Sequence, residues 1–168
     1  MVNYQKKICL LGEFAVGKTS LIRRFIEGIF DEKYLTTIGV VVSRKSVTFP
    51  EVNVNLLVWD LAGGRDFSQT NYLAGVAGAL IVCDLTRSST LAAYHTYSRQ
   101  VKQVNANAHL ILLANKSDLS RQREISEEEL IAVSNELGAP YLLTSAKTGE
   151  MVEYAFTELA RQMLDIIS

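Results

Sequence analysis

Apolar and β-branched residues gather along this chain in short runs, separated by polar and turn-forming segments. Runs of this length and composition predict β-strands, over Lys7–Leu11, Val40–Phe49, Val54–Trp59, Ala79–Leu85, Leu110–Ala114 and Tyr141–Leu143. Most segments between them repeat apolar residues every three or four positions, which is helical spacing. This alternation of strand and helix is typical of an α/β fold with a mostly parallel sheet.

The second and third predicted strands are the exception to parallel pairing. Only Pro50-Glu51-Val52-Asn53 joins them, and four residues are too few for a helical crossover. We therefore expect an antiparallel hairpin at one edge of a six-stranded sheet whose other strands are parallel.

The helical segments are bounded by recognisable start and stop signals. The predicted helices cover about Lys18–Glu27, Ser88–Asn105, Glu127–Leu137 and Met151–Ile166. Gly28 ends the first helix, and Ser126-Glu127-Glu128-Glu129 forms a capping box before the third. The last helix carries an apolar stripe that we interpret as core packing rather than a partner-binding face, formed by Val152, Phe156, Leu159, Met163 and Ile166. We expect about five helices in total.

Length and composition favour one domain over residues 1–168 in a reducing compartment such as the cytoplasm. The chain is long enough for a full hydrophobic core without disulfides or metals. A net charge of −1 gives no basic surface of the kind that dominates nucleic-acid binding. The two cysteines, Cys9 and Cys83, lie inside apolar runs, which predicts buried thiols.

Membrane attachment has no signal in this sequence. No apolar stretch approaches the roughly 18 residues of a membrane span, and no signal-peptide core follows Met1. Val2 stands where N-myristoylation needs glycine, and the chain ends without a cysteine for prenylation. We expect no lipid anchor on this chain, although a chain cut from a longer one would look the same.

A glycine-rich loop follows the first predicted strand. Gly12-Glu13-Phe14-Ala15-Val16-Gly17-Lys18-Thr19 matches G-x-x-x-x-G-K-[ST] and leads into a helix, so backbone N–H groups can converge on a polyphosphate. Glycines allow the close backbone approach. In this motif Lys18 reaches the β- and γ-phosphates and Thr19 holds Mg²⁺. The residues expected to contact the nucleotide here are Phe14, Ala15, Val16, Gly17, Lys18, Thr19 and Ser20. With the strand pattern, the loop predicts the three-layer P-loop NTPase fold.

An acidic residue ends the third predicted strand, in Trp59-Asp60-Leu61-Ala62-Gly63-Gly64. Open α/β sheets place their ligands at the carboxyl ends of strands. Asp60 is the expected Mg²⁺ partner, acting through water, and the Gly63 N–H can meet a γ-phosphate. An Asp followed by glycines is equally a plain turn, so this segment alone leaves both interpretations open.

Two further tetrapeptides follow predicted strands: Asn115-Lys116-Ser117-Asp118 and Thr144-Ser145-Ala146-Lys147. A carboxylate such as Asp118 accepts two hydrogen bonds from N1–H and the exocyclic amine of guanine, a donor pair that adenine lacks. The Lys116 stem can cover the purine ring, and the Ala146 backbone can donate to guanine O6. Guanine is thus the predicted base, contacted by Asn115, Lys116, Asp118, Ser145, Ala146 and Lys147.

With these motifs in this order, the chain resembles the small GTPases of the Ras superfamily, and most closely their Rab branch. The resemblance covers essentially the full length and includes Thr37-Ile38-Gly39. The likeness to Rab proteins rests on Ile38-Gly39-Val40, Trp59 and Phe67. It implies a molecular switch that binds GTP or GDP with Mg²⁺. It also implies that Phe30 lies edge-on to guanine and Tyr34 over the phosphates.

The resemblance assigns the switching to two loops. It implies that Thr37 coordinates Mg²⁺ and the γ-phosphate only with GTP bound, while Gly63 contacts that phosphate from the other side. Loss of the phosphate would release about Asp31–Val41 and Ala62–Leu73. The alternative interpretation of Thr37 beside Thr36 is a polar start to a strand, and the spacing of the family motif favours Thr37 as a ligand.

The chain departs from the family pattern at the hydrolytic step. Gly64 stands where the family has the glutamine that orients the attacking water, and Phe14 stands where the family favours a small residue. An arginine finger with a positioned water contributes on the order of 10³–10⁵ in rate, so we expect intact binding and slow hydrolysis. Arg65 is a candidate for compensation, or part of a partner surface. Val41-Val42 replaces the usual acidic-aromatic pair, so the effector and regulatory proteins stay unidentified.

The predicted function is therefore a GTP-binding switch and weak GTP hydrolase, whose predicted catalytic residues are Lys18, Thr37, Gly63, Gly64 and Arg65. The alternative is an interaction module that keeps its nucleotide and never cycles. A P-loop kinase would require an arginine-rich lid segment, and the sequence contains none. The sequence leaves open the cellular process, the oligomeric state, and whether the source is a bacterial relative or a trimmed eukaryotic domain.

Overall fold

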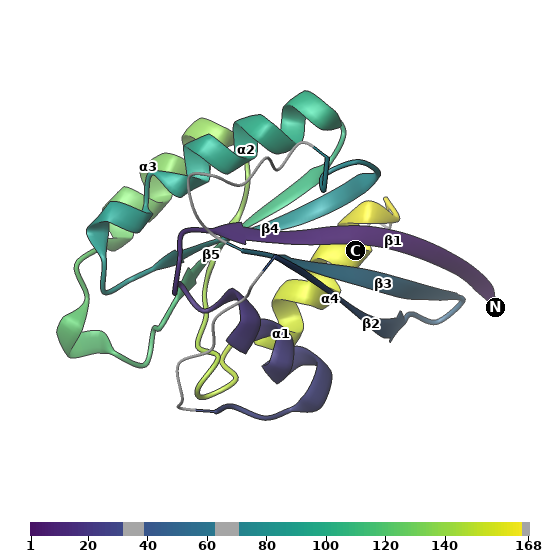
Figure 1. The fold of residues 1–168 in the computed structure, drawn as a ribbon, viewed down its shortest axis with the longest axis horizontal. Helices are drawn as coiled ribbons and strands as arrows, with labels where there is room; N and C mark the ends of the chain where they lie inside the picture. Colours follow the sequence, from purple (N-terminus) through teal and green to yellow (C-terminus); the bar gives the residue numbers. More distant parts are fainter. Residues whose placement is uncertain (32–38, 63–70, 166–168) are drawn as a thin grey trace.

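The computed structural model describes residues 1–31, 39–62 and 71–165, and these residues form a six-stranded sheet between two layers of helices (Figure 1). The strands follow the spatial order β2-β3-β1-β4-β5-β6. Their bounds are β1 Val2–Gly12, β2 Val40–Thr48, β3 Val52–Leu61, β4 Val76–Asp84, β5 His109–Asn115 and β6 Tyr141–Leu143. Only β2 is antiparallel to its neighbour, so the predicted edge hairpin on a parallel sheet is confirmed.

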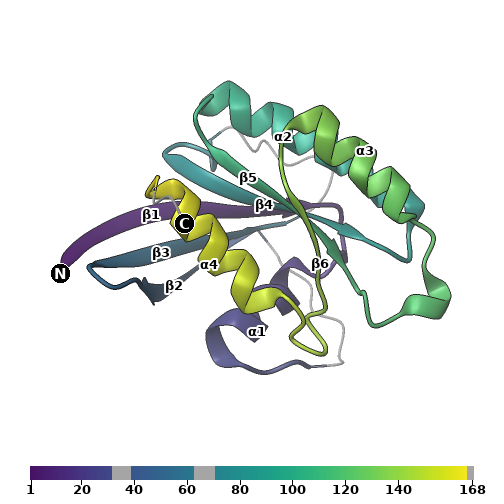
Figure 2. The same ribbon diagram turned by 180° about the vertical axis from the view of Figure 1, so that it is seen from behind.

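The described residues contain four α-helices, against an expectation of about five for the whole chain. They are α1 Lys18–Glu27, α2 Ala93–Val104, α3 Glu127–Leu137 and α4 Val152–Met163. Two short 3₁₀ helices, η1 Ser88–Thr90 and η2 Ser120–Gln122, complete this part of the chain. Helices α1 and α4 cover one face of the sheet, and α2 and α3 cover the other (Figure 2).

Strand β1 shows why the chain folds into three layers. Its alternate residues Ile8 and Leu10 are buried in the hydrophobic cluster that α1 and α4 complete. Cys9 and Leu11 point the other way, into the cluster that α2 and α3 complete. Successive side chains of a strand point to opposite faces, and here both sets are apolar. Both faces of the sheet must therefore be buried, and the two layers of helices bury them.

Several predicted boundaries shift for local reasons. Strand β1 begins at Val2 rather than Lys7, because residues 2–6 pair with β3 although their side chains are mostly exposed. The hairpin turn is shorter than predicted, since Phe49 and Val52 already exchange backbone hydrogen bonds. The predicted helix over Ser88–Asn105 starts as η1, where the Thr90 hydroxyl bonds the backbone at Asp84, and becomes α-helical only at Ala93.

The helix ends agree better with the sequence. Both capping-box hydrogen bonds of α3 are present between Ser126 and Glu129, and Gly28 ends α1 in a left-handed conformation. In α4, the predicted stripe is confirmed as core over Val152, Phe156, Leu159 and Met163. Ile166 lies outside the described residues.

The two cysteines are buried, as predicted. Neither Cys9 nor Cys83 is exposed to solvent, and burial raises the pKa of both thiols to about 12. Along the described stretches of chain, every helix is too short or too polar to traverse a lipid bilayer.

Candidate functional site

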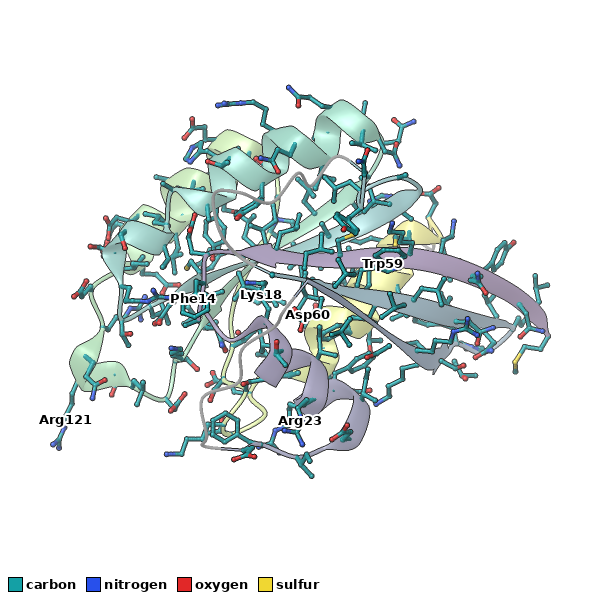
Figure 3. The ribbon with its side chains drawn as sticks, viewed as in Figure 1. Phe14, Lys18, Arg23, Trp59, Asp60 and Arg121 are labelled. Carbon is teal, nitrogen blue, oxygen red and sulfur yellow. The ribbon has the colours of Figure 1, made fainter. Side chains whose placement is uncertain are left out.

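The motifs selected from the sequence meet at one edge of the sheet. The loop 12–17 follows β1, Asp60 lies near the end of β3, and residues 116–118 and 144–147 follow β5 and β6. Because these strands are parallel, their carboxyl ends lie on the same side. Phe14, Lys18 and Asp60 are seen at this edge in Figure 3.

The phosphate loop, residues 12–19, has no space for a side chain at either of its two motif glycines. A Cβ at Gly12 would lie 2.4 Å from the Val82 carbonyl oxygen. A Cβ at Gly17 would lie 2.3 Å from the Asn115 side-chain nitrogen, and Gly17 also has a φ of +105°. The glycines therefore let the loop lie directly against β4 and β5, as the sequence predicts for close backbone approach.

Lys18 begins α1 and is folded back into the loop. Its ammonium donates hydrogen bonds to the carbonyl oxygens of Gly12 (3.1 Å) and Glu13 (3.0 Å), and the residue is only 6% exposed. Burial lowers the pKa of Lys18 to about 8, and the negative charges of Asp60 and Glu13 oppose this shift. A buried ammonium with a lowered pKa is a binding group that gains from an anionic ligand.

Thr19 and Asp60, both predicted from the sequence to serve a Mg²⁺ ion, lie within hydrogen-bond distance of each other. The Thr19 hydroxyl donates to an Asp60 carboxylate oxygen over 2.6 Å, and Asp60 is 3% exposed. A hydroxyl and a carboxylate offer only oxygen atoms, the donor set that Mg²⁺ prefers. The residues present thus fit a magnesium ion. Thr37, the third predicted metal ligand, lies outside the described residues.

The segments after β5 and β6 are tied to the phosphate loop and to each other. The Asn115 amide donates to the Val16 carbonyl oxygen (3.0 Å) and accepts from the Thr144 hydroxyl (3.2 Å). The Ser145 hydroxyl donates to Asp118 over 2.7 Å, which fixes the direction of that carboxylate. The two predicted base-binding segments therefore form one unit with the phosphate loop.

Sequence reasoning missed a buried carboxylate at the centre of this unit. Asp84, 1% exposed at the end of β4, contacts the ammonium of Lys116 (2.8 Å) and the guanidinium of Arg87 (3.2 Å). Burial raises its pKa, but hydrogen bonds from Lys116 and Thr86 outweigh burial and hold the pKa below the ordinary value. The available signal was its position: an acidic residue at the carboxyl end of a strand.

The two cationic side chains around Asp84 also donate hydrogen bonds to the phosphate loop. Arg87 donates to the Phe14 carbonyl oxygen over 2.6 Å, and Lys116 donates to the Ala15 carbonyl oxygen over 3.1 Å. Two successive carbonyls of the loop are thus held by side chains that follow β4 and β5. We assign Arg87 and Asp84 to the support of the phosphate loop.

The other predicted contact residues are placed as follows. Ala146 is buried, Phe30 packs against the cluster under α1, and Phe14 is 51% exposed. Ser20 is half-buried on α1, and Lys147 is exposed. The predictions for Tyr34, Gly63, Gly64 and Arg65 lie outside the described residues.

A sequence model of the Ras family matches residues 7–165 of this chain. The chain belongs to the Ras family. It is 34% identical over 161 residues to the Ras-related protein Rab-13 of Canis lupus familiaris, covering 94% of this chain and 79% of that protein. It is 35% identical over 164 residues to the GTP-binding protein ypt2 of Schizosaccharomyces pombe, covering 96% and 82%.

This Ras-family protein is accordingly a Rab-like small GTPase, and the resemblance inferred from its motifs is confirmed. The α/β fold with a mostly parallel six-stranded sheet agrees with that family. In this fold, the phosphate loop, the Asp60 segment and the segments after β5 and β6 lie together at one edge of the sheet.

Proposed function

We propose that the chain is a guanine-nucleotide switch that binds GTP and GDP with Mg²⁺ and hydrolyses GTP slowly. The observation that carries the proposal is the convergence of Lys18, Asp60, Asp118 and Ala146 at one edge of the sheet, within a continuous hydrogen-bond network. Four chain segments far apart in sequence meet there, each with the donor or acceptor that one part of a guanosine polyphosphate requires.

The phosphate half of the site acts through charge and backbone amides. Lys18 is held by the Gly12 and Glu13 carbonyls, and its ammonium can share its protons with a β- or γ-phosphate. The amides at the start of α1 add an anion-binding helix end. Thr19 and Asp60 would hold Mg²⁺, which when bound neutralises charge on the phosphates.

The base half of the site selects guanine. Ser145 directs the Asp118 carboxylate, which accepts from N1–H and the exocyclic amine of the base. Lys116 reaches across to Ala15, so its aliphatic stem can lie along the purine ring. The Ala146 amide donates to O6, where adenine carries an amine.

The switch itself is assigned to Thr37 and Gly63, each of which would contact the γ-phosphate from its own loop. Their output would be a surface recognised by effector and regulatory proteins, in a cytoplasmic chain with no nucleic-acid partner. Val41 and Val42, both about half exposed on the edge strand β2, adjoin the first of these loops. Apolar side chains at that place suit a protein partner.

Slow hydrolysis follows from the residues at two positions, 64 and 14. Gly64 offers no group to orient the attacking water, and Arg65, the next residue in the sequence, is the candidate to compensate. Phe14 is 51% exposed on the phosphate loop, so its ring is available to occupy space near the γ-phosphate. These same residues support the second candidate function, an interaction module that retains its nucleotide and never cycles.

Guanine selectivity is the direct test of the proposal. We expect fluorescent GTP and GDP to bind at least about a hundredfold more tightly than ATP, because adenine would leave Asp118 and the Ala146 amide unpaired. We also expect EDTA to accelerate release. The measurement is fluorescence titration and release with and without Mg²⁺. Comparable ATP affinity, or no effect of Mg²⁺, would overturn the proposal.

The lowered pKa of Lys18 predicts proton uptake on binding. With a pKa of about 8, part of the Lys18 population is neutral in the free protein at pH 8, and phosphate favours the charged form. GDP binding should therefore take up a fraction of a proton that grows from pH 7 to pH 8, and affinity should fall as pH rises above 8. Calorimetry in buffers of different ionisation enthalpy measures the uptake. Lys18→Arg, which stays charged, should abolish it; uptake that does not change between pH 7 and pH 8 would contradict the assignment.

A further inference from the structure

Arg24 connects helix α1 to the base-contacting part of the site. Its guanidinium Nε donates to the Ala146 carbonyl oxygen over 2.9 Å, and one terminal nitrogen donates to the Lys147 carbonyl oxygen. The other terminal nitrogen donates to the Gly28 carbonyl oxygen over 3.3 Å. One side chain on α1 therefore holds two successive carbonyls of the base loop, which we define as residues 145–149.

The same side chain also packs against the far end of the base loop. A Cβ built on Gly149 would lie 3.7 Å from Arg24 Cδ, so the arginine stem lies against the glycine backbone. Inside the loop the Gly149 N–H donates to the Ser145 carbonyl oxygen, the Ser145 hydroxyl donates to Asp118, and Ala146 is buried in the core cluster. Arg24 thus joins the loop to the phosphate-binding helix by hydrogen bonds to successive carbonyls.

Helix α1 does not depend on Arg24 for its own position. Leu21, Ile22 and Phe25 are buried in the core, and Phe25 stacks on Phe156 of α4 with ring centroids 4.0 Å apart. A partly buried contact at the helix edge adds little to a helix anchored in this way. Removal of Arg24 should thus leave α1 in place and release only the base loop.

Helix α1 then supports both the phosphate end and the base end of a bound guanine nucleotide. Lys18 and Thr19 begin α1, and Arg24 follows Lys18 by six residues, about 9 Å along the helix axis. We propose that Arg24 is a positioning residue that fixes the base loop to α1 and thereby sets the rate at which guanine nucleotide leaves. This inference rests on the proposed function, since it concerns the same site.

The experiment measures release of N-methylanthraniloyl-GDP from the preloaded full chain after excess GDP is added. We expect Arg24→Ala to raise the release rate about tenfold to a hundredfold, because two charge-assisted hydrogen bonds to the base loop are lost. Arg24→Lys keeps one charged donor group, so its release rate should lie between those of the wild type and Arg24→Ala. The association rate should change by less than about threefold, since the phosphate loop is intact.

Arg23 provides a matched control. It is the adjacent arginine on α1, labelled in Figure 3, and pairs with Glu27 of the same helix at 3.4 Å. Arg23→Ala removes the same charge one position away, so it should leave the release rate within about twofold of the wild type.

A second ligand separates positioning of the base from general support of α1. Inorganic tripolyphosphate has no base, so its affinity should be the same in wild type and both Arg24 variants. If Arg24→Ala weakens tripolyphosphate as much as it speeds GDP release, or leaves the release rate unchanged, the inference is overturned. If the wild-type chain itself binds no guanine nucleotide, the proposed function fails instead.

Discussion

Asp118→Asn is expected to exchange the preferred base from guanine to xanthine. The carboxylate accepts two hydrogen bonds from guanine, whereas the asparagine amide donates one to the O2 carbonyl that xanthine has in place of the amine. Bonds to charged groups contribute about 1.5–3 kcal/mol each, so GDP affinity should fall about 10²–10⁴-fold. XDP affinity should rise above that of GDP, as measured by competition against a fluorescent nucleotide.

The local structure around Asp118 should tolerate this change. Ser145 donates to one carboxylate oxygen, and an asparagine keeps an oxygen acceptor for that bond. Glu150→Gln is the matched control, because it makes the same acid-to-amide change next to the base loop, where Glu150 accepts from Ser117. It should alter neither affinity. An Asp118→Asn variant that still prefers GDP to XDP would show that this carboxylate does not read the base.

Gly64→Gln and Phe14→Gly are each expected to accelerate GTP hydrolysis. The first supplies a side chain to orient the attacking water, and the second removes a ring that is 51% exposed on the phosphate loop. A positioned group at the reacting water contributes roughly 10²–10⁴-fold, so each substitution should raise the single-turnover rate about tenfold or more. The measurement is phosphate release from preloaded protein under single-turnover conditions.

Phe14→Leu is the control for this pair, because it keeps a bulky apolar side chain at the same position. It should hydrolyse GTP close to the wild-type rate, while GTP affinity should be unchanged in all three variants. Acceleration by Gly64→Gln or Phe14→Gly would support a damped switch. Absence of detectable hydrolysis in every variant would instead favour the interaction module that never cycles.

The regular parts of the fold were predictable because local pattern decides them. The apolar runs of β4, β5 and β6 and the bounds of α1 and α3 agree with the sequence to within three residues. The strands are marked by short apolar runs and the two helices by Gly28 and the capping box, and none of these signals depends on the rest of the chain. The predicted helix from Ser88 failed at its start, because the Thr90 hydroxyl bonds the backbone and competes with the helical pattern.

The support of the site was not predictable by the same reasoning. Motifs identified Lys18 and Asp118, but Arg24 contacts Ala146 across 122 positions of sequence, and nothing in the local pattern indicates that contact. From the sequence, Arg87 could equally be an exposed residue in a turn, and only the structure shows its hydrogen bond to the Phe14 carbonyl oxygen. Side chains that act by holding backbone carbonyls have no spacing rule, so only the tertiary structure locates them.

The burial of Cys9 and Cys83 gives this chain a practical property. With a pKa of about 12 for each thiol, fewer than about one in ten thousand is in the reactive thiolate form at neutral pH. Both sulfurs are also shielded from solvent. A single cysteine introduced on the surface would therefore take a maleimide dye selectively, and the native pair would not have to be replaced first.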